Sequence, residues 1–114
     1  MNGLGRESVI IKSLGDDLSG TLFVGDNFGP SPALIICHGA GEFKENYYEL
    51  CEYLARRGFS SLALDMHGHG ASEGTRHHVK ISEWVADIAA AVQFLLRAGR
   101  PETIDSRRWT NSRR

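Results

Sequence analysis

Two glycine-rich loops, each directly behind a short apolar run, constrain the fold of this chain more than any other feature. The first loop covers residues 38–42 (His-Gly-Ala-Gly-Glu), and the second covers residues 67–74 (His-Gly-His-Gly-Ala-Ser-Glu-Gly). Loops of this kind at the ends of buried strands are where open α/β sheets build their active sites. The two loops therefore predict an α/β fold with a site at the ends of its strands.

The apolar runs before and between the loops predict a mixed sheet. Residues 9–11 and 18–24 are typical of two strands joined by a turn at residues 15–17, which makes an antiparallel hairpin. Residues 33–37 form a continuous apolar run that is too short for a helix and indicates a central, parallel strand covered on both faces. Residues 59–65 predict a second strand of the same kind.

Two amphipathic helices are expected on the faces of this sheet. The first starts at Asn46, which can form a capping box with Glu49, and ends at Gly58. The second is capped by Ser82 and ends near Gly99. The apolar stripes expected to face the core are Tyr47, Leu50, Cys51 and Leu54 in the first helix, and Val85, Ile88, Ala89, Val92 and Leu96 in the second. The fold class is thus a partial α/β sheet: an N-terminal hairpin and two parallel strands with two flanking helices.

The chain divides into a domain over residues 1–101 and an irregular, arginine-rich tail over residues 102–114. The expected next strand is absent from this tail, which is interpreted as a solvated charge run with Trp109 and the arginines Arg107, Arg108, Arg113 and Arg114. Thirteen Lys plus Arg against fourteen Asp plus Glu give a formal net charge of −1, so no global field attracts nucleic acid or an anionic membrane. We expect a small, neutral partner.

Neither an export signal nor an anchor is visible in the sequence. Residues 1–8 are polar, and no apolar run approaches the roughly 20 residues that a membrane span needs. Cys37 and Cys51 lie in segments expected to be buried, where reduced cysteine behaves as a small apolar residue. A cytoplasmic location without a membrane span is expected.

Two motif matches in the loops are rejected on spacing. A dinucleotide-binding Gly-x-Gly-x-x-Gly would need a third glycine where the chain has Lys44, so no cofactor is expected. Residues 70–74 match the Gly-x-Ser-x-Gly pattern of a nucleophile elbow, in which the serine sits directly between a strand and a helix. Here the strand ends near Asp65, several residues too early, so Ser72 is interpreted as a loop hydroxyl bonded to local backbone.

A metal- or cofactor-binding domain is a further hypothesis. It would use the histidines of the second loop and its neighbourhood, which are His67, His69, His77 and His78. Their spacing matches no known zinc pattern, so no metal is expected.

The two loops resemble those of the α/β-hydrolase superfamily, especially its serine aminopeptidase and monoacylglycerol-lipase-like branch. Residues 36–42 resemble the oxyanion-hole loop of the family, and residues 64–74 resemble its Asp-x-x-Gly-His-Gly-x-Ser-x-Gly segment. The resemblance runs from about Ser8 to Leu96 and covers the N-terminal half of such a domain.

The resemblance implies roles for individual residues. Ala40 would donate its backbone N–H to the oxyanion of a tetrahedral intermediate. The residues that would shape this loop are His38, Gly39, Gly41 and Glu42, and those with a structural role in the second loop are Asp65, His69, Gly70 and Ser72. The catalytic serine, acid and histidine of the family come from later strands, so no catalytic residue is assigned. The chain is expected to be a truncated, inactive fragment of a protein that hydrolyses a small ester or amide.

The same resemblance predicts an open sheet edge, because the strand at residues 33–37 would be flanked by a strand that this chain lacks. An apolar edge strand is a template for pairing with another chain. A self-associating or marginally stable chain is therefore expected. The alternative function is a non-enzymatic interaction module that takes a strand from a partner through this edge.

Overall fold

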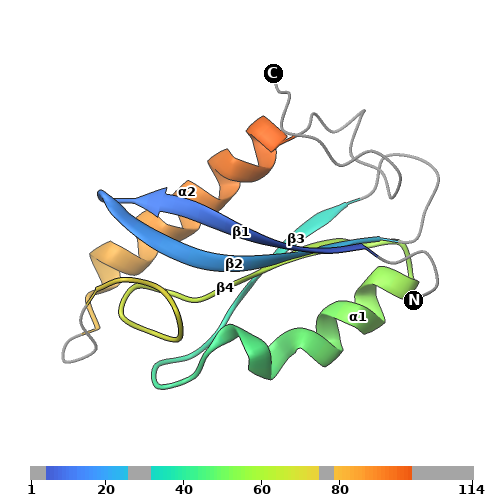
Figure 1. The fold of residues 1–114 in the computed structure, drawn as a ribbon, viewed down its shortest axis with the longest axis horizontal. Helices are drawn as coiled ribbons and strands as arrows, with labels where there is room; N and C mark the ends of the chain where they lie inside the picture. The colour runs from blue at the N-terminus through green and yellow to red at the C-terminus, as the bar shows by residue number, and fades with distance from the viewer. Residues whose placement is uncertain (1–4, 26–31, 75–78, 99–114) are drawn as a thin grey trace.

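The computed structural model describes residues 5–25, 32–74 and 79–98, which form a four-stranded mixed sheet between two helices (Figure 1). The predicted fold class, a partial α/β sheet, is confirmed. The spatial order is β1-β2-β4-β3; β1 pairs antiparallel with β2, β2 antiparallel with β4, and β4 parallel with β3. The strands are β1 (Gly5–Ser13), β2 (Asp16–Val24), β3 (Ala33–Cys37) and β4 (Ser60–Leu64).

The hairpin of β1 and β2 is longer and tighter than the sequence pattern indicates. Its connection is the pair Leu14-Gly15, with φ of 52° and 83°. Positive φ at both central residues is typical of the two-residue turns that match the twist of a hairpin, and Gly15 adopts it without strain. The turn predicted at residues 15–17 is therefore wrong by about one residue, since Asp16 already pairs with Ser13.

The two parallel strands differ in burial. All five residues of β4 are buried, whereas β3 lies at the edge of the sheet among the described residues, with Leu34 38% exposed. The prediction of a central β3 covered on both faces is wrong, and Cys37, expected to be buried, is exposed. A fully buried parallel strand has both faces covered and usually a strand on each side, whereas among the described residues β3 has β4 as its only neighbouring strand. Among the described residues, β3 therefore forms the open edge of the sheet.

The first helix begins with a short turn of 3₁₀ helix, η1 (Lys44–Tyr47), and continues as α1 (Tyr48–Arg56). The predicted capping box is wrong, because the residue before α1 is Tyr47 and its side chain makes no capping bond. The helix ends at Arg56, and Gly58, with a φ of 89°, closes this end as predicted. This helix packs against β2 and β4, where Phe23, Cys51 and Ala63 form a small core.

The second helix, α2 (Ile81–Ala98), lies on the opposite face of the sheet from α1 (Figure 1). Ser82 lies inside it rather than at its cap. The stripe predicted to face the core faces outward; its exposed members are Val85, Ile88, Ala89, Val92 and Leu96. Ala91 and Leu95 instead pack on the sheet with the main core, whose buried members include Leu18, Leu22, Leu62, Leu64 and Met66.

Charge explains why this side of α2 is buried. The helix is apolar around most of its circumference, so its periodicity does not decide which side faces the sheet. Asp87, one of its few charged residues, is fully buried against polar groups of the hairpin and the second loop. Within the described part of the chain, neither helix is long and apolar enough to cross a membrane. The predicted tail at residues 102–114 lies outside the described residues.

Candidate functional site

The first glycine-rich loop leaves the C-terminal end of β3 and is tied to the second loop by His38. This side chain is buried, and its Nε2 accepts a hydrogen bond from the Met66 N–H at 3.0 Å. Its Nδ1 is 2.8 Å from the carbonyl oxygen of Gly39, to which it donates in the tautomer that leaves Nε2 free to accept. The ring therefore joins the ends of two adjacent parallel strands.

The backbone N–H groups of residues 39–42 are nearly all engaged within the protein. Gly39 donates to Glu42 Oε1 at 2.7 Å, Gly41 donates to His69 Nε2 at 3.0 Å, and the Glu42 N–H donates to the Gly39 carbonyl at 3.1 Å. The Ala40 N–H makes no hydrogen bond to any described residue. Gly41 has a φ of 83°, a conformation that glycine adopts without strain. The loop thus holds one N–H group free between two fixed neighbours.

Glu42 stabilises this arrangement by its charge. The hydrogen bond from the Gly39 N–H, followed by that from the Tyr47 hydroxyl at 2.8 Å, lowers the pKa of the Glu42 carboxyl. The carboxylate accepts both bonds through the same oxygen, Oε1. An ionised acceptor makes a stronger bond than a neutral one, so the first turn of the loop is firmly closed.

The second loop is organised around the buried carboxylate of Asp65. It accepts bonds from the Lys44 N–H at 2.7 Å, the Lys44 Nζ at 3.1 Å and the Ala71 N–H at 3.0 Å. Burial opposes the charge of Lys44, but its bonds to Glu45 and Asp65 outweigh this, and the pKa of the lysine is raised. Sequence analysis missed Lys44 as a partner, because the pair is separated by 21 residues and no local spacing marks it.

Ser72 and Gly70 lie where the second loop folds back on Asp65. The Ser72 hydroxyl donates to the Asp65 carbonyl at 2.6 Å and accepts from the Ser19 N–H at 2.8 Å. Gly70 has a φ of 54°, and a Cβ there would lie 2.3 Å from the Asp65 carboxyl. Both positions serve the packing of the loop against β2, and the Ser72 hydroxyl is already used in two hydrogen bonds.

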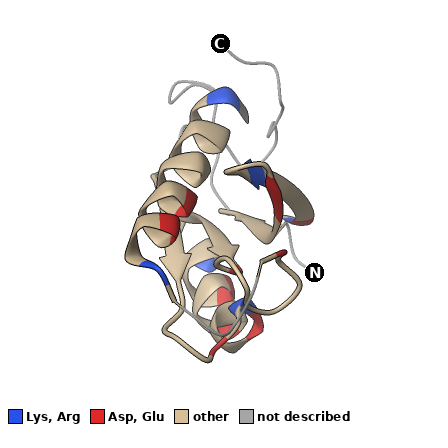
Figure 2. Cartoon of the chain, turned by 90° about the vertical axis from the view of Figure 1, so that its left-hand side faces the viewer, with Lys and Arg blue, Asp and Glu red and all other residues tan. Residues whose placement is uncertain are grey.

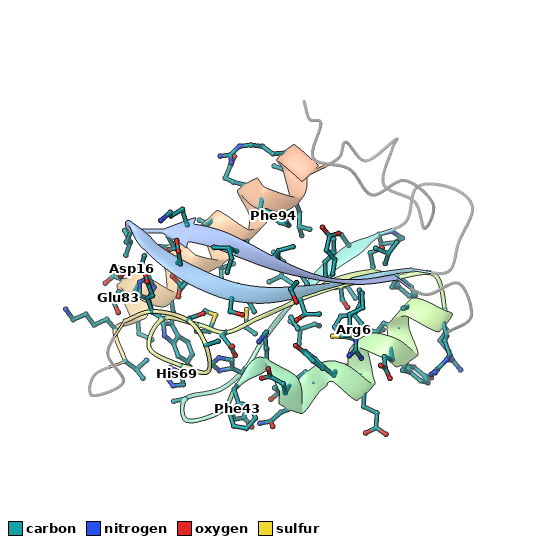
Figure 3. All side chains as sticks on the ribbon, viewed as in Figure 1. Arg6, Asp16, Phe43, His69, Glu83 and Phe94 are labelled. Atoms are coloured by element: carbon teal, nitrogen blue, oxygen red, sulfur yellow. The ribbon has the colours of Figure 1, made fainter. Side chains whose placement is uncertain are left out.

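A second buried polar cluster, which sequence analysis missed, joins the second loop to α2. Asp87 accepts bonds from the Ser13 hydroxyl at 2.7 Å and the His67 N–H at 2.8 Å, and its Oδ1 is 2.6 Å from His67 Nδ1. The other ring nitrogen of His67 is 3.0 Å from Asp16. Asp16 and Glu83 lie near each other at the hairpin end of α2 (Figure 3).

The charges of this cluster act on the imidazole of His67. Burial would lower its pKa, but the hydrogen bonds to Asp87 and Asp16 and the charges of Asp87 and Glu83 outweigh burial. The pKa of His67 is therefore raised, which favours the imidazolium form between two carboxylates. The sequence contains little that would identify this pair. His67 and Asp87 are 20 residues apart, on a loop and a helix, and only the fold determines that they face each other.

The three histidine rings that the structure describes have little capacity left for a metal ion. His69 Nδ1 is 3.0 Å from the His67 carbonyl oxygen, and its Nε2 accepts from Gly41. The rings of His38, His69 and Trp84 also contact one another, with centroids 5.1–5.7 Å apart. In the described ranges, no three His, Cys, Asp or Glu side chains are grouped to hold a metal. His77 and His78, named in the metal hypothesis, lie outside those ranges.

Known proteins share both the sequence pattern and the fold of this chain. The family described as serine aminopeptidase, S33, matches residues 29–104. A monoacylglycerol lipase of Mycolicibacterium smegmatis is 33% identical over 64 residues. Among solved structures, Est1E of Butyrivibrio proteoclasticus with bound ferulic acid is 29% identical with a TM-score of 0.69, and the α/β-hydrolase GrgF of a Penicillium species is 26% identical with a TM-score of 0.76.

The chain is much shorter than these proteins. The matched part is 55% of this chain and 23% of the lipase. The structural matches cover 75% of this chain and 36% of Est1E, and 83% of this chain and 33% of GrgF. The chain thus spans about a quarter to a third of the length of the relatives it matches.

Proposed function

Because the chain belongs to the serine aminopeptidase S33 family of the α/β-hydrolase superfamily, we propose that residues 38–42 form the oxyanion-binding loop of a serine hydrolase. In this function the Ala40 N–H donates to the negatively charged oxygen that develops when an ester or amide carbonyl is attacked. The acyl transfer is carried out by a longer protein that contains these residues.

The free N–H of Ala40 is the observation that carries this proposal. The N–H groups of its neighbours Gly39 and Gly41 donate to Glu42 and His69. An oxyanion-hole donor has to be held in position before the reaction and has to be without a partner inside the protein. Of the N–H groups of residues 39–42, Ala40's alone lacks an acceptor among the described residues, and two anchored neighbours fix its direction.

The chemistry needs groups that the described residues do not provide. A second donor to the oxyanion comes, in hydrolases of this fold, from the residue after the nucleophile. The Ser72 hydroxyl donates to the Asp65 carbonyl and accepts from the Ser19 N–H, so it is poorly suited to attack a carbonyl. We expect the 114-residue chain alone to be inactive.

The family description names a peptidase, which cleaves amides, but two named relatives support testing esters first. One is named a monoacylglycerol lipase, and the Est1E structure contains ferulic acid, a carboxylic acid that an ester of it would release. An ester also has a better leaving group than an amide. Stabilising the oxyanion therefore supplies a larger share of the total lowering of the barrier that ester hydrolysis needs. Esters of small carboxylic acids are therefore the first substrates to test.

The test removes the Ala40 N–H without changing the side chain. Ala40 is replaced by lactic acid, which puts an ester oxygen in place of the N–H, in a protein extended by the downstream genomic reading frame. Loss of one oxyanion donor is expected to lower kcat for nitrophenyl esters by about a hundred- to a thousand-fold. Ala40→Gly is the matched control, since it keeps the N–H, and its rate is expected to stay within a few-fold of the unmodified protein.

Labelling with a fluorophosphonate probe tests the other half of the proposal. The extended protein is expected to label and the 114-residue chain is not. The proposal would be overturned if the short chain labels and its Ser72→Ala variant does not. It would also be overturned if the lactate variant folds normally and keeps its full rate.

A further inference from the structure

Two peptide units meet at Ala40, and a histidine ring contacts each of them. The Ala40 N–H belongs to the same peptide unit as the Gly39 carbonyl, and the Ala40 carbonyl belongs to the same unit as the Gly41 N–H. His38 Nδ1 is 2.8 Å from the Gly39 carbonyl oxygen. His69 Nε2 is 3.0 Å from the Gly41 nitrogen. The two rings therefore act on the peptide units before and after Ala40.

The second contact of each ring fixes which nitrogen carries the proton. His38 Nε2 accepts from the Met66 N–H at 3.0 Å, so the proton of the neutral ring is on Nδ1 and is donated to the carbonyl of the first loop. His69 accepts from the first loop through Nε2, so its proton is also on Nδ1, which is 3.0 Å from the His67 carbonyl oxygen. His38 thus holds the first loop as a donor, whereas His69 holds it as an acceptor.

The contact made by His38 sets the direction of the Ala40 N–H. The peptide bond between Gly39 and Ala40 is trans, so this N–H points opposite to the Gly39 carbonyl. The carbonyl accepts two bonds, from His38 Nδ1 and from the Glu42 N–H at 3.1 Å, so its peptide plane has little freedom to rotate. Hydrogen bonds in a chain also polarise one another. The bonds to the carbonyl therefore make the Ala40 N–H a stronger donor as well as a fixed one.

Both rings are buried against each other and against α2. Their centroids are 5.1 Å apart, and the ring of Trp84 lies 5.4–5.7 Å from them. Their hydrogen-bond partners are backbone groups, whereas the two acidic residues of α2, Glu83 and Asp87, which Figure 2 shows in red on the helix, act on His67. Among the described residues no carboxylate is hydrogen-bonded to either ring, and the contacts of both require the neutral form.

We propose that His38 and His69 are positioning residues for the acyl transfer. His38 orients the Ala40 N–H through the carbonyl to which it donates, and His69 fixes the following peptide unit through the N–H from which it accepts. Loss of either contact lets one peptide unit at Ala40 rotate, so the N–H is aligned less often with the oxyanion. This inference rests on the function proposed for the Ala40 loop and adds the side chains through which its donor is held.

Asparagine and glutamine at the two positions separate positioning from packing. Both remove the ring, but the asparagine amide lies near the former place of Nδ1 and the glutamine amide near that of Nε2. His38→Asn therefore keeps the donor to the first loop and His38→Gln loses it. His69→Gln keeps the acceptor for the first loop and His69→Asn loses it. A role in packing alone would rank the two amides alike at both positions.

The kinetics of the extended protein with nitrophenyl esters measure this crossed pattern. The variants that lose the loop contact, His38→Gln and His69→Asn, are each expected to have a kcat at least about tenfold below that of the other amide at the same position. KM is expected to stay the same, because the donor acts on the oxyanion and not on the bound ester. The same ranking of asparagine and glutamine at both positions would overturn the inference.

The replacement of Ala40 by lactic acid separates this inference from the function on which it rests. Without the N–H there is no donor to position, so in that background the two amides at each position are expected to differ by less than about twofold. Amide pairs that keep their full difference there would refute the positioning roles alone. A lactate variant that keeps its full rate would refute the proposed function itself.

Hydrogen exchange in the 114-residue chain tests the contacts without catalysis. After correction for sequence, the Gly41 amide is expected to exchange at least about tenfold more slowly than the Ala40 amide in the unmodified chain, because only the former is hydrogen-bonded. His69→Asn is expected to remove this protection and His69→Gln to retain it. Equal exchange of the two amides in the unmodified chain, or protection of Gly41 that His69→Asn leaves unchanged, would also overturn the inference.

Discussion

The Asp87→Asn substitution is the sharpest test of how the second loop is held in place. The carboxylate of Asp87 is fully buried and accepts three hydrogen bonds, from the Ser13 hydroxyl, the His67 N–H and the His67 ring. Asparagine has nearly the same shape but offers one acceptor oxygen in place of two. Its amide N–H₂ group must replace one carboxylate oxygen, and the Ser13 hydroxyl or the His67 ring can accept from it only by giving up its present role as a donor.

The expected cost follows from these contacts. A buried donor left without an acceptor costs about 1–3 kcal/mol. Loss of the charge beside a His67 whose pKa is raised moves the cost toward the roughly 3–5 kcal/mol of a broken buried ion pair. We therefore expect Asp87→Asn to lower the free energy of unfolding by about 3 kcal/mol, a large share of the total of about 5–15 kcal/mol typical of a small domain.

Asp16→Asn provides the matched control. Asp16 contacts the same histidine at 3.0 Å, but its side chain is 45% exposed, so water can replace much of the interaction. Its loss is expected to cost about 1 kcal/mol or less. Urea unfolding, followed by tryptophan fluorescence at a fixed low concentration, measures both. At roughly 1–3 kcal/mol per molar urea, Asp87→Asn lowers the midpoint by about 1–3 M. Equal and small losses for the two variants would refute the reasoning.

Three further predictions concern the same loop. The stabilisation from the raised pKa of His67 is fully present below a pH of about 6.5, the ordinary pKa of an unfolded histidine, and is lost as pH rises through the folded pKa. Urea titrations at several pH values should show this loss, and the His67→Gln variant should lack this pH dependence. Ser72→Ala leaves the Ser19 N–H without its acceptor and should cost about 1–3 kcal/mol in the same assay; no change would contradict the structural role. Gly70→Ala forces a Cβ to within 2.3 Å of the Asp65 carboxyl at a φ of 54°, and should destabilise the chain more than Ser72→Ala does.

The elements that sequence analysis predicted correctly are those with a local cause. Gly58 ends its helix because a positive φ suits glycine, and short apolar runs form β3 and β4 because they are too short for helices. The glycine-rich loops follow their strands for the same reason: chain reversal after a strand needs small residues. Signals of this kind are complete within a few residues, so a sequence pattern contains them.

The errors have a common cause in tertiary contacts. The most periodic stripe of α2 predicts the wrong buried face, because nearly every side of the helix is apolar and the bond of Asp87 to His67 sets its orientation. The capping box of the first helix does not form, and Lys44 just before it is instead drawn inward by Asp65, 21 residues later. Partners separated by 20 or more residues cannot be identified from local spacing.

The cross-links between the two loops bear on how well the proposed oxyanion donor is preorganised. His38 accepts from Met66 and His69 accepts from Gly41, in both cases through Nε2, so each ring has to be neutral to make its bond. These rings fix the first loop against the second, and the second is held in turn by the buried carboxylates of Asp65 and Asp87. An N–H held in this way requires no rearrangement when negative charge develops on a substrate oxygen, and that is the condition under which a single donor has its largest effect on rate. The described residues of both loops therefore hold the Ala40 N–H in the way that its proposed role requires.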